Sequence, residues 1–274
     1  MERRAFAQTS VATLCAAATR TAAEPGPAAA DLYEVRTYTL PAAKLPRLDD
    51  YLKNAFIPAA RRLGVGPVGV FAEADGFERE VRTDKKSATT PAADARRVTV
   101  LLVHPSAESL AAMPGKLAAD EAYRRAAADY LAATADDPVY QRIGTTLLRA
   151  FAGMPRLAAP DPTKPRLFNL RVYESHNERA AAKKVEMFET GELAIFKRVG
   201  LTPVFFASAL AGPALPNLTY LLVFPDEAGR AAAWGRFGKD PAWLELRGMP
   251  GYADKEIVSK ITNTILAPRP YSEI

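Results

Sequence analysis

Apolar and polar residues alternate along residues 32–40, LYEVRTYTL, and nearly the same pattern returns at residues 167–175 as LFNLRVYES. Such alternation is typical of a β-strand whose two faces meet different surroundings. The similarity continues downstream, where RRLGVGPVGVFAE matches KRVGLTPVFFAS and VTVLLVHP matches LTYLLVFP. The chain therefore contains two copies of one unit.

Each copy reads as a strand, a helix, a short strand, a longer strand, a helix and a closing strand. This order is the βαββαβ ferredoxin-like unit, which has an antiparallel sheet. In the second copy we expect strands at 167–174, 204–209, 218–224 and 260–267 and helices at 178–199 and 227–237. Asn177, Asp226 and Asp240 stand where helix N-caps belong, and Gly64 and Gly200 where left-handed caps belong.

Composition divides the chain into four parts. We expect a leader at residues 1–30, the first repeat at 31–152, a Pro-rich linker at 153–166 and the second repeat at 167–274. The first repeat carries an insertion at about 74–97. The insertion is polar and has no periodic apolar pattern, so it is expected to be a mobile surface loop.

The strand VTVLLVH and its counterpart LTYLLVF are apolar on both faces, which an open sheet with one wet side would not favour. Both sheet faces are therefore covered, most simply by the two repeats facing each other. This predicts an α+β fold, a barrel of antiparallel sheets with the helices outside. We expect the polar face of the repeated strand to point inward and line a ligand chamber with Glu34, Arg36, Tyr38, Asn169, Arg171 and Tyr173.

The first thirty residues resemble an export signal. Arg3 and Arg4 precede a short apolar run and then a stretch of small residues, as in a twin-arginine signal. An unstructured N-terminus is the alternative. The export interpretation predicts a bacterial periplasmic or extracellular protein, and since Cys15 is the only cysteine, its mature form has no thiol.

The formal net charge of +5 is small, and both signs are interspersed along the chain. Neither a nucleic-acid-binding motif nor an apolar run long enough to span a membrane is found in the sequence. It also has no nucleotide-binding glycine motif and no G-x-S-x-G elbow. We therefore expect no cofactor, no metal, no nucleic acid partner and no membrane span.

Only two histidines are available for acid–base chemistry. His104 ends a strand, and a position near the barrel rim is its simplest interpretation. His176 precedes a helix start and is the candidate general base, although an ordinary loop histidine is the alternative. Glu192 lies on the apolar stripe of its helix, where we expect an interface or capping role.

Four stretches resemble the NIPSNAP proteins, a branch of the dimeric α/β-barrel superfamily. They are DLYEVRTYTL, LFNLRVYESHNERAAAKKVEMFETGELAIFKRVGLTPVFF, LPNLTYLLVFPDEAGRAAAWGRFGKDPAW and IVSKITNTILAPRPYSEI. The resemblance implies a tandem ferredoxin-like barrel, with homo-oligomers in keeping with it. Superfamily relatives include cofactor-free monooxygenases, isomerases and haem enzymes, so the fold does not choose a chemistry.

Three functions stay open on the sequence. The first is a barrel that binds a small organic ligand, anionic ones included, or a protein partner. The second is a cofactor-independent monooxygenase or isomerase, with His176 as base and Arg36 and Arg171 holding an enolate. The third is a structural scaffold or oligomer with a filled barrel.

Overall fold

A computed structural model describes residues 30–83, 87–90 and 95–274, so the expected leader at 1–30 lies almost wholly outside the described residues. The expected element order is present in both repeats. The first repeat comprises β1 (Leu32–Pro41), η1 (Ala42–Lys44), α1 (Leu45–Tyr51), η2 (Leu52–Phe56), α2 (Ile57–Arg62), β2 (Val68–Glu73), β3 (Arg79–Thr83), β4 (Ser87–Thr90), β5 (Ala95–His104), α3 (Ala107–Ala119), α4 (Glu121–Ala126), α5 (Ala128–Leu131) and β6 (Arg142–Ala150).

The second repeat is more regular and lacks the insertion. It comprises β7 (Leu167–Glu174), α6 (Glu178–Met187), η3 (Phe188–Glu192), α7 (Leu193–Val199), β8 (Thr202–Ala211), β9 (Asn217–Phe224), α8 (Glu227–Lys239), α9 (Pro241–Gly248), α10 (Asp254–Ile257) and β10 (Lys260–Pro268).

The strands of the two repeats close into one antiparallel barrel. Its order is β2-β5-β1-β6-β8-β9-β7-β10, and β10 returns to pair with β2. Each repeat contributes one ferredoxin-like sheet, and the seams are β6 with β8 and β10 with β2. This confirms the predicted fold class.

The insertion of the first repeat differs from the expected bare loop. Its strands β3 and β4 pair with each other, and β3 also pairs with the first part of β10, from Lys260 to Asn263. That part of β10 precedes the residues that pair with β2, so its hydrogen-bonding edge is free for β3. The sequence of β3, REVRT, has no clear apolar face, so the pattern of apolar residues did not predict this strand.

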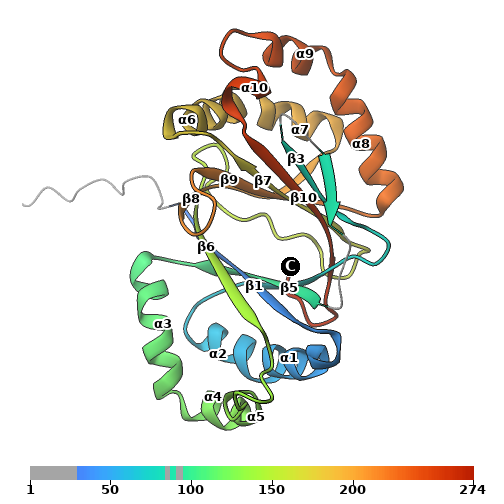
Figure 1. The fold of residues 1–274 in the computed structure, drawn as a ribbon. Coiled ribbons are helices and arrows are strands. Elements are labelled where there is room, and N and C mark those ends of the chain that lie inside the picture. Colours follow the sequence, from blue (N-terminus) through green and yellow to red (C-terminus); the bar gives the residue numbers. More distant parts are fainter. Residues whose placement is uncertain (1–29, 84–86, 91–94) are drawn as a thin grey trace, which may run out of the picture.

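Helices cover the outside of the barrel on two opposite sides (Figure 1). Helices α1 to α5 lie against the sheet of the first repeat and α6 to α10 against that of the second. A third apolar cluster fills the barrel interior, with Tyr33, Phe71, Phe168 and Phe205 among its members. The barrel is thus packed, like the core of any close-packed protein.

The helix ends follow the expected signals. Asn177, Asp226 and Asp240 each accept a hydrogen bond from a backbone N–H in the first turn of the helix that follows. Gly64 and Gly200 have φ values of +70° and +83°, the left-handed region that glycine adopts without strain. In both repeats the first long helix contains a π-helical turn, η2 or η3, at the same place.

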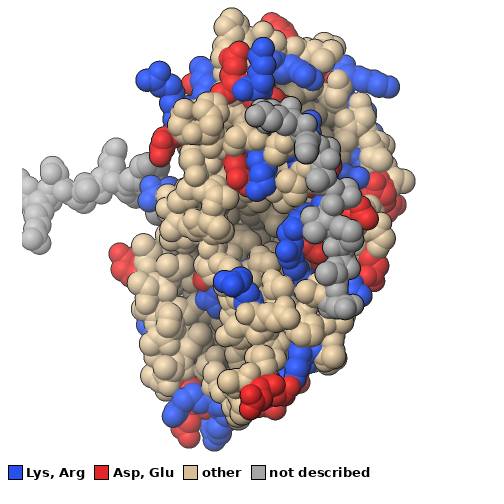
Figure 2. Space-filling view, in the orientation of Figure 1, with Lys and Arg blue, Asp and Glu red and all other residues tan. Residues whose placement is uncertain are grey.

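Basic and acidic side chains are interspersed on the face shown in Figure 2 and do not form a patch of one sign. Within the part of the chain that the structure describes, we find no helix long and apolar enough to cross a bilayer.

Candidate functional site

The polar face of the repeated strand turns toward the helices. On β1, the Arg36 guanidinium carbon lies 5.2 Å from the ring centroid of Phe56 in η2. On β7, the Arg171 guanidinium carbon lies 4.6 Å from the ring centroid of Trp234 in α8. Tyr38 belongs to the helix-side core of its repeat. The expectation that this set points into the barrel is therefore wrong.

The barrel interior is instead lined by the face that we expected under the helices. Tyr33 and Phe168 both belong to the interior cluster and are fully buried. Alternation identifies the residues that share a face, but both faces of this sheet are covered and partly apolar. Sequence pattern alone therefore gave no means of deciding which face turned inward.

In the first repeat, Arg36 is held by Glu34 on the same strand face. The Nε and Nη2 atoms of Arg36 donate to the two carboxylate oxygens of Glu34 at 2.5 and 3.0 Å. His104 of β5 is fully buried, and its Nε2 lies 3.1 Å from Glu34 Oε2. Burial alone would raise the pKa of Glu34, but the hydrogen bonds from His104 and Arg36 lower it to about 2.

A pocket of about 470 Å³ opens beside Arg36, between β1 and helices α3 to α5. We call it the first-repeat pocket. Its lining combines two arginines, several phenol rings and an apolar wall. The lining residues are Arg36, Tyr38, Tyr51, Phe56, Met113, Pro114, Leu117, Ala118, Tyr123, Arg124, Tyr130, Leu131 and Ile143.

The tyrosines of the first-repeat pocket are fixed by one another. The Tyr51 and Tyr123 hydroxyl oxygens are 3.0 Å apart, and the Tyr51 and Tyr130 rings stack with centroids 3.6 Å apart. Burial raises the pKa of Tyr38, Tyr51 and Tyr130, so these phenols stay protonated at neutral pH. They present hydroxyl groups that both donate and accept hydrogen bonds.

The equivalent space in the second repeat is filled. Arg171 pairs with Tyr220 on β9, and Arg36 pairs with Val100 on β5. Val100 and Tyr220 occupy matching positions in the two repeats, so the two arginines are structural counterparts. Trp234 covers Arg171 and donates its indole N–H to Asn169 at 3.2 Å.

The residue at position 114 explains why the pocket is open in the first repeat and the equivalent space is filled in the second. Helices α3 and α8 both have 13 residues and follow the capping residues Ser106 and Asp226. Pro114 and Trp234 therefore occupy the same place in the two helices. Because proline is much smaller than tryptophan, the first repeat keeps an opening where the second is closed.

The other polar groups of the second repeat are also buried. Tyr220 donates to the Tyr173 hydroxyl at 3.0 Å, and Arg171 Nη2 donates to the same oxygen at 3.1 Å. The Arg171 Nε atom is buried without a hydrogen-bond partner. Of the predicted set, Asn169, Arg171 and Tyr173 thus lie together, and Trp234 packs against Arg171 and Asn169.

Glu192 is an ion-pair partner rather than an interface or capping residue. It is 2% exposed, and Lys184, which is 1% exposed, donates to its carboxylate at 3.2 Å. It makes no side-chain cap at the start of α7. Burial raises the pKa of Glu192, although the Lys184 ammonium opposes this.

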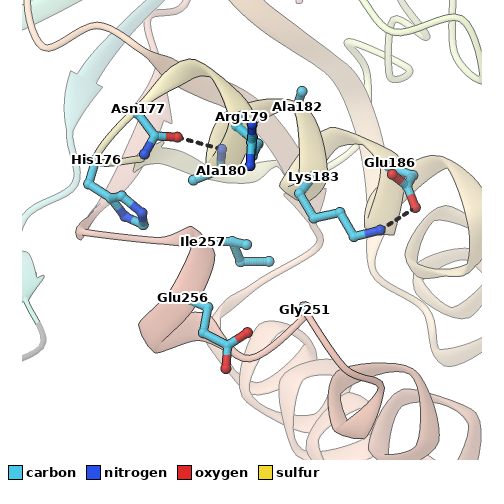
Figure 3. A pocket seen from close by; sticks show the side chains of 10 residues that line it. All are labelled: His176, Asn177, Arg179, Ala180, Ala182, Lys183, Glu186, Gly251, Glu256 and Ile257. Atoms are coloured by element: carbon cyan, nitrogen blue, oxygen red, sulfur yellow. Dashed lines mark hydrogen bonds and ion pairs between the residues drawn. The ribbon is translucent and has the colours of Figure 1, made fainter.

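His176 lies apart from both arginines. It is exposed and lines a shallow pocket of about 490 Å³ between the start of α6 and α10, with Lys183, Glu186 and Glu256 (Figure 3). Neither Arg36 nor Arg171 lines this pocket. The structure therefore does not bring the candidate base and the candidate enolate-holding arginines together.

No cluster of three or more His, Cys, Asp or Glu side chains able to hold a metal ion occurs among residues 30–83, 87–90 and 95–274. His104 is fully buried against Glu34 and does not line the first-repeat pocket. The polar groups that do line it suit an organic ligand better than a metal ion.

Sequence reasoning missed most of the pocket. Tyr51, Tyr123 and Tyr130 come from three different helices, and nothing in their spacing indicated that they meet. One signal was present: the offset that matches the third strands also places Pro114 on Trp234 and Tyr123 on Trp243.

Comparison with known proteins supports the fold. A candidate monooxygenase of Fusobacterium nucleatum subsp. nucleatum is 8% identical, with 88% of this chain and 93% of that chain covered and a TM-score of 0.50. A second candidate monooxygenase, from Lactobacillus acidophilus, is 10% identical, with 87% and 94% covered and a TM-score of 0.50. At these identities the likeness concerns the fold alone.

A smaller structure matches part of the chain. It is an uncharacterised NIPSNAP-like domain protein from Burkholderia xenovorans, 20% identical, covering 40% of this chain and 90% of that chain, with a TM-score of 0.36. None of the curated proteins matches the chain in sequence.

The family comparison concerns the second repeat. The NIPSNAP family model matches residues 168–273, which begin in β7 and continue beyond β10. The same strand order, helix caps and π-helical turn occur in the first repeat, outside the matched residues. Residues 168–273 of this chain are therefore similar to the NIPSNAP family, and they pair in one barrel with a second ferredoxin-like repeat.

Proposed function

We propose that this protein binds a small aromatic ligand in the first-repeat pocket. The observation that carries the proposal is the contrast between the two repeats. Arg36 and Tyr38 line an open pocket of about 470 Å³, whereas Arg171, the counterpart of Arg36, is covered by Trp234. Two copies of one scaffold thus differ at the place where a ligand would sit.

The chemistry of the lining favours a neutral aromatic ligand over an anion. The charge of Arg36 is balanced by the Glu34 carboxylate, whose pKa of about 2 keeps it ionised at neutral pH. The second arginine of the lining, Arg124, is exposed, and water screens its charge. A guanidinium still attracts the face of an aromatic ring, and stacked tyrosines such as Tyr51 and Tyr130 offer further ring contacts. Hydroxyls at the edge would orient the ligand.

The enzyme, export and scaffold hypotheses drawn from the sequence have less structural support than ligand binding in the first-repeat pocket. A monooxygenase or isomerase reaction with His176 as base gains no support from geometry, because His176 lines a different pocket. Export from a bacterial cell and a homo-oligomeric or scaffold role remain proposals that rest on the sequence. Binding in the first-repeat pocket is compatible with each of them.

The test is a fluorescence titration with prodan, a neutral naphthalene dye whose emission shifts blue in apolar surroundings. Wild-type protein is expected to bind one equivalent. The variant Pro114→Trp copies the second repeat and is expected to lose binding, because the new indole fills the pocket. It also removes a proline from inside α3, so helix propensity gives no reason for it to misfold.

Two control variants locate the effect. Ala111→Trp places the same side chain at an exposed position of α3 outside the lining, and His176→Ala alters the other pocket. Both are expected to bind prodan as the wild type does. Equal binding by wild type and Pro114→Trp, or no binding by the wild type, would overturn the proposal.

A further inference from the structure

We infer that the ligand of the first-repeat pocket is a planar, electron-rich aromatic ring carrying one N–H or O–H donor, with indole as the smallest representative. The inference rests on the proposed function and adds the chemical class and the pose of the ligand. Its source is the second repeat, where the side chain of Trp234 occupies the matching space.

Trp234 shows how this scaffold holds an aromatic ring. The ring lies over the Arg171 guanidinium at 4.6 Å, and the indole N–H donates to the Asn169 side-chain oxygen at 3.2 Å. The ring therefore uses its electron-rich face and its one donor at the same time. Both partners come from the same face of β7, two residues apart.

The first repeat carries counterparts of both partners without the tethered ring: Arg36 lines the pocket, and Glu34 lies behind it, against the guanidinium and outside the lining. Arg36 is the counterpart of Arg171, and Glu34 is the counterpart of Asn169. Pro114 replaces Trp234, and Leu117 stands where Phe237 packs against that indole. A free ligand can thus take the place that the tryptophan side chain fills in the other half of the barrel.

Glu34 is able to accept one more hydrogen bond. A carboxylate has about four lone-pair sites, and three are used by Arg36 Nε, Arg36 Nη2 and His104 Nε2. Glu34 is 6% exposed, whereas Asn169 is fully buried and is nevertheless reached by Trp234. Replacement of the amide by a carboxylate also makes the acceptor stronger, which favours a ligand with a donor group.

The charge of the site points to a neutral ligand with a donor rather than to an acid. A carboxylate beside Arg36 would also face Glu34, and like charges at close range repel, whereas the charge of the other lining arginine, the exposed Arg124, is screened by water. An electron-rich ring gains most from stacking on the guanidinium. Indoles and phenols satisfy both conditions, whereas aryl carboxylates satisfy only the second.

The test compares indole with 1-methylindole by calorimetry on the wild-type protein. 1-Methylindole carries a methyl group where indole has its N–H, so the comparison removes the donor that would bind Glu34. Indole is expected to bind one equivalent, and 1-methylindole to bind about tenfold or more weakly, since hydrogen bonds to charged groups are strong. Pro114→Trp should abolish both signals.

A second variant tests whether the space that Trp234 fills can itself bind indole. Trp234→Ala empties the space in the second repeat, and the folded variant should bind two equivalents of indole. Its thermal stability should rise on addition of indole by more than that of the wild type. Failure of this variant to fold would leave the wild-type comparison as the deciding test.

The outcomes separate the two claims. Equal affinity for indole and 1-methylindole, or prodan binding without indole binding, would overturn the inference and leave the proposed pocket standing. Absence of binding by prodan, indole and 1-methylindole alike would overturn both. Preference for indole that survives in Pro114→Trp would show that indole binds elsewhere and would also overturn the inference.

Discussion

The guanidinium carbon of Arg171 lies 4.6 Å from the ring centroid of Trp234, so a tryptophan closes over an arginine in the second repeat. The counterpart arginine, Arg36, lines an open pocket beside Pro114. Duplication produced two similar half-barrels, and one residue on the second long helix of each separates an open site from a closed one.

The two arginines are expected to have different roles. Arg36→Gln should weaken prodan binding about fivefold or more, because a cation over an aromatic ring is worth about 0.5–2 kcal/mol. Arg171→Gln should leave prodan binding unchanged and lower the free energy of unfolding by about 2 kcal/mol, since Trp234 and Tyr173 lose their partner. Titration and urea denaturation measure the two effects. Weaker prodan binding by Arg171→Gln would contradict the closed second site.

The stability of the protein should depend on the charge of Glu34. Its pKa falls from 4.5 to about 2 on folding, so its contribution of about 3 kcal/mol is present above pH 4.5 and is lost as the pH falls toward 2. Glu34→Gln should therefore be less stable than wild type at pH 7, and the gap should narrow by pH 2. Glu245→Gln, at an exposed position of α9, is the control. A gap that stays constant with pH would refute the role of Glu34.

The barrel interior should tolerate no added volume at Gly69. A Cβ atom there would lie 2.6 Å from the Phe71 ring and 3.2 Å from Ile274, both in the interior cluster. Gly69→Ala is expected to destabilise the protein by about 1–3 kcal/mol. Gly144→Ala on β6 meets no atom within 4 Å and should not destabilise it. A stable Gly69→Ala variant would argue for an open chamber, as the sequence first indicated.

The buried pair Lys184 and Glu192 should be costly to break and cheap to replace. Lys184→Met leaves the Glu192 carboxylate buried alone, and we expect a loss of about 3–5 kcal/mol in urea denaturation. The double variant Lys184→Met with Glu192→Leu should come within about 1 kcal/mol of the wild type. Lys183→Met, at the exposed neighbouring position, is the matched control. A double variant as unstable as the single one would show that the pair does more than neutralise itself.

Much of the fold could be predicted from the sequence. The strand β7 occupies residues 167–174 as alternation indicated, and the caps Asn177, Asp226 and Asp240 begin the helices assigned to them. These features are local, because a period of two or a capping side chain depends on neighbours in the sequence.

The candidate site was harder to predict, because it depends on which face of the strand turns inward. Arg36 and Tyr38 were chosen for the correct reason, as polar residues on a covered strand, but they were placed on the wrong side of it. Tyr51, Tyr123 and Tyr130 lie in three helices that are separate in the sequence and come together only in the fold. The alignment of the two repeats already matched Pro114 with Trp234. Only the structure shows that the Trp234 ring covers Arg171, and this contact explains why the difference matters.

A crystal structure of the protein grown with prodan would test the central claim most directly. We predict density for the dye beside Pro114, between Arg36 and the stacked rings of Tyr51 and Tyr130, and none over Arg171 in the second repeat. Density in the barrel interior or beside His176, or an empty first-repeat pocket in a crystal saturated with dye, would contradict it.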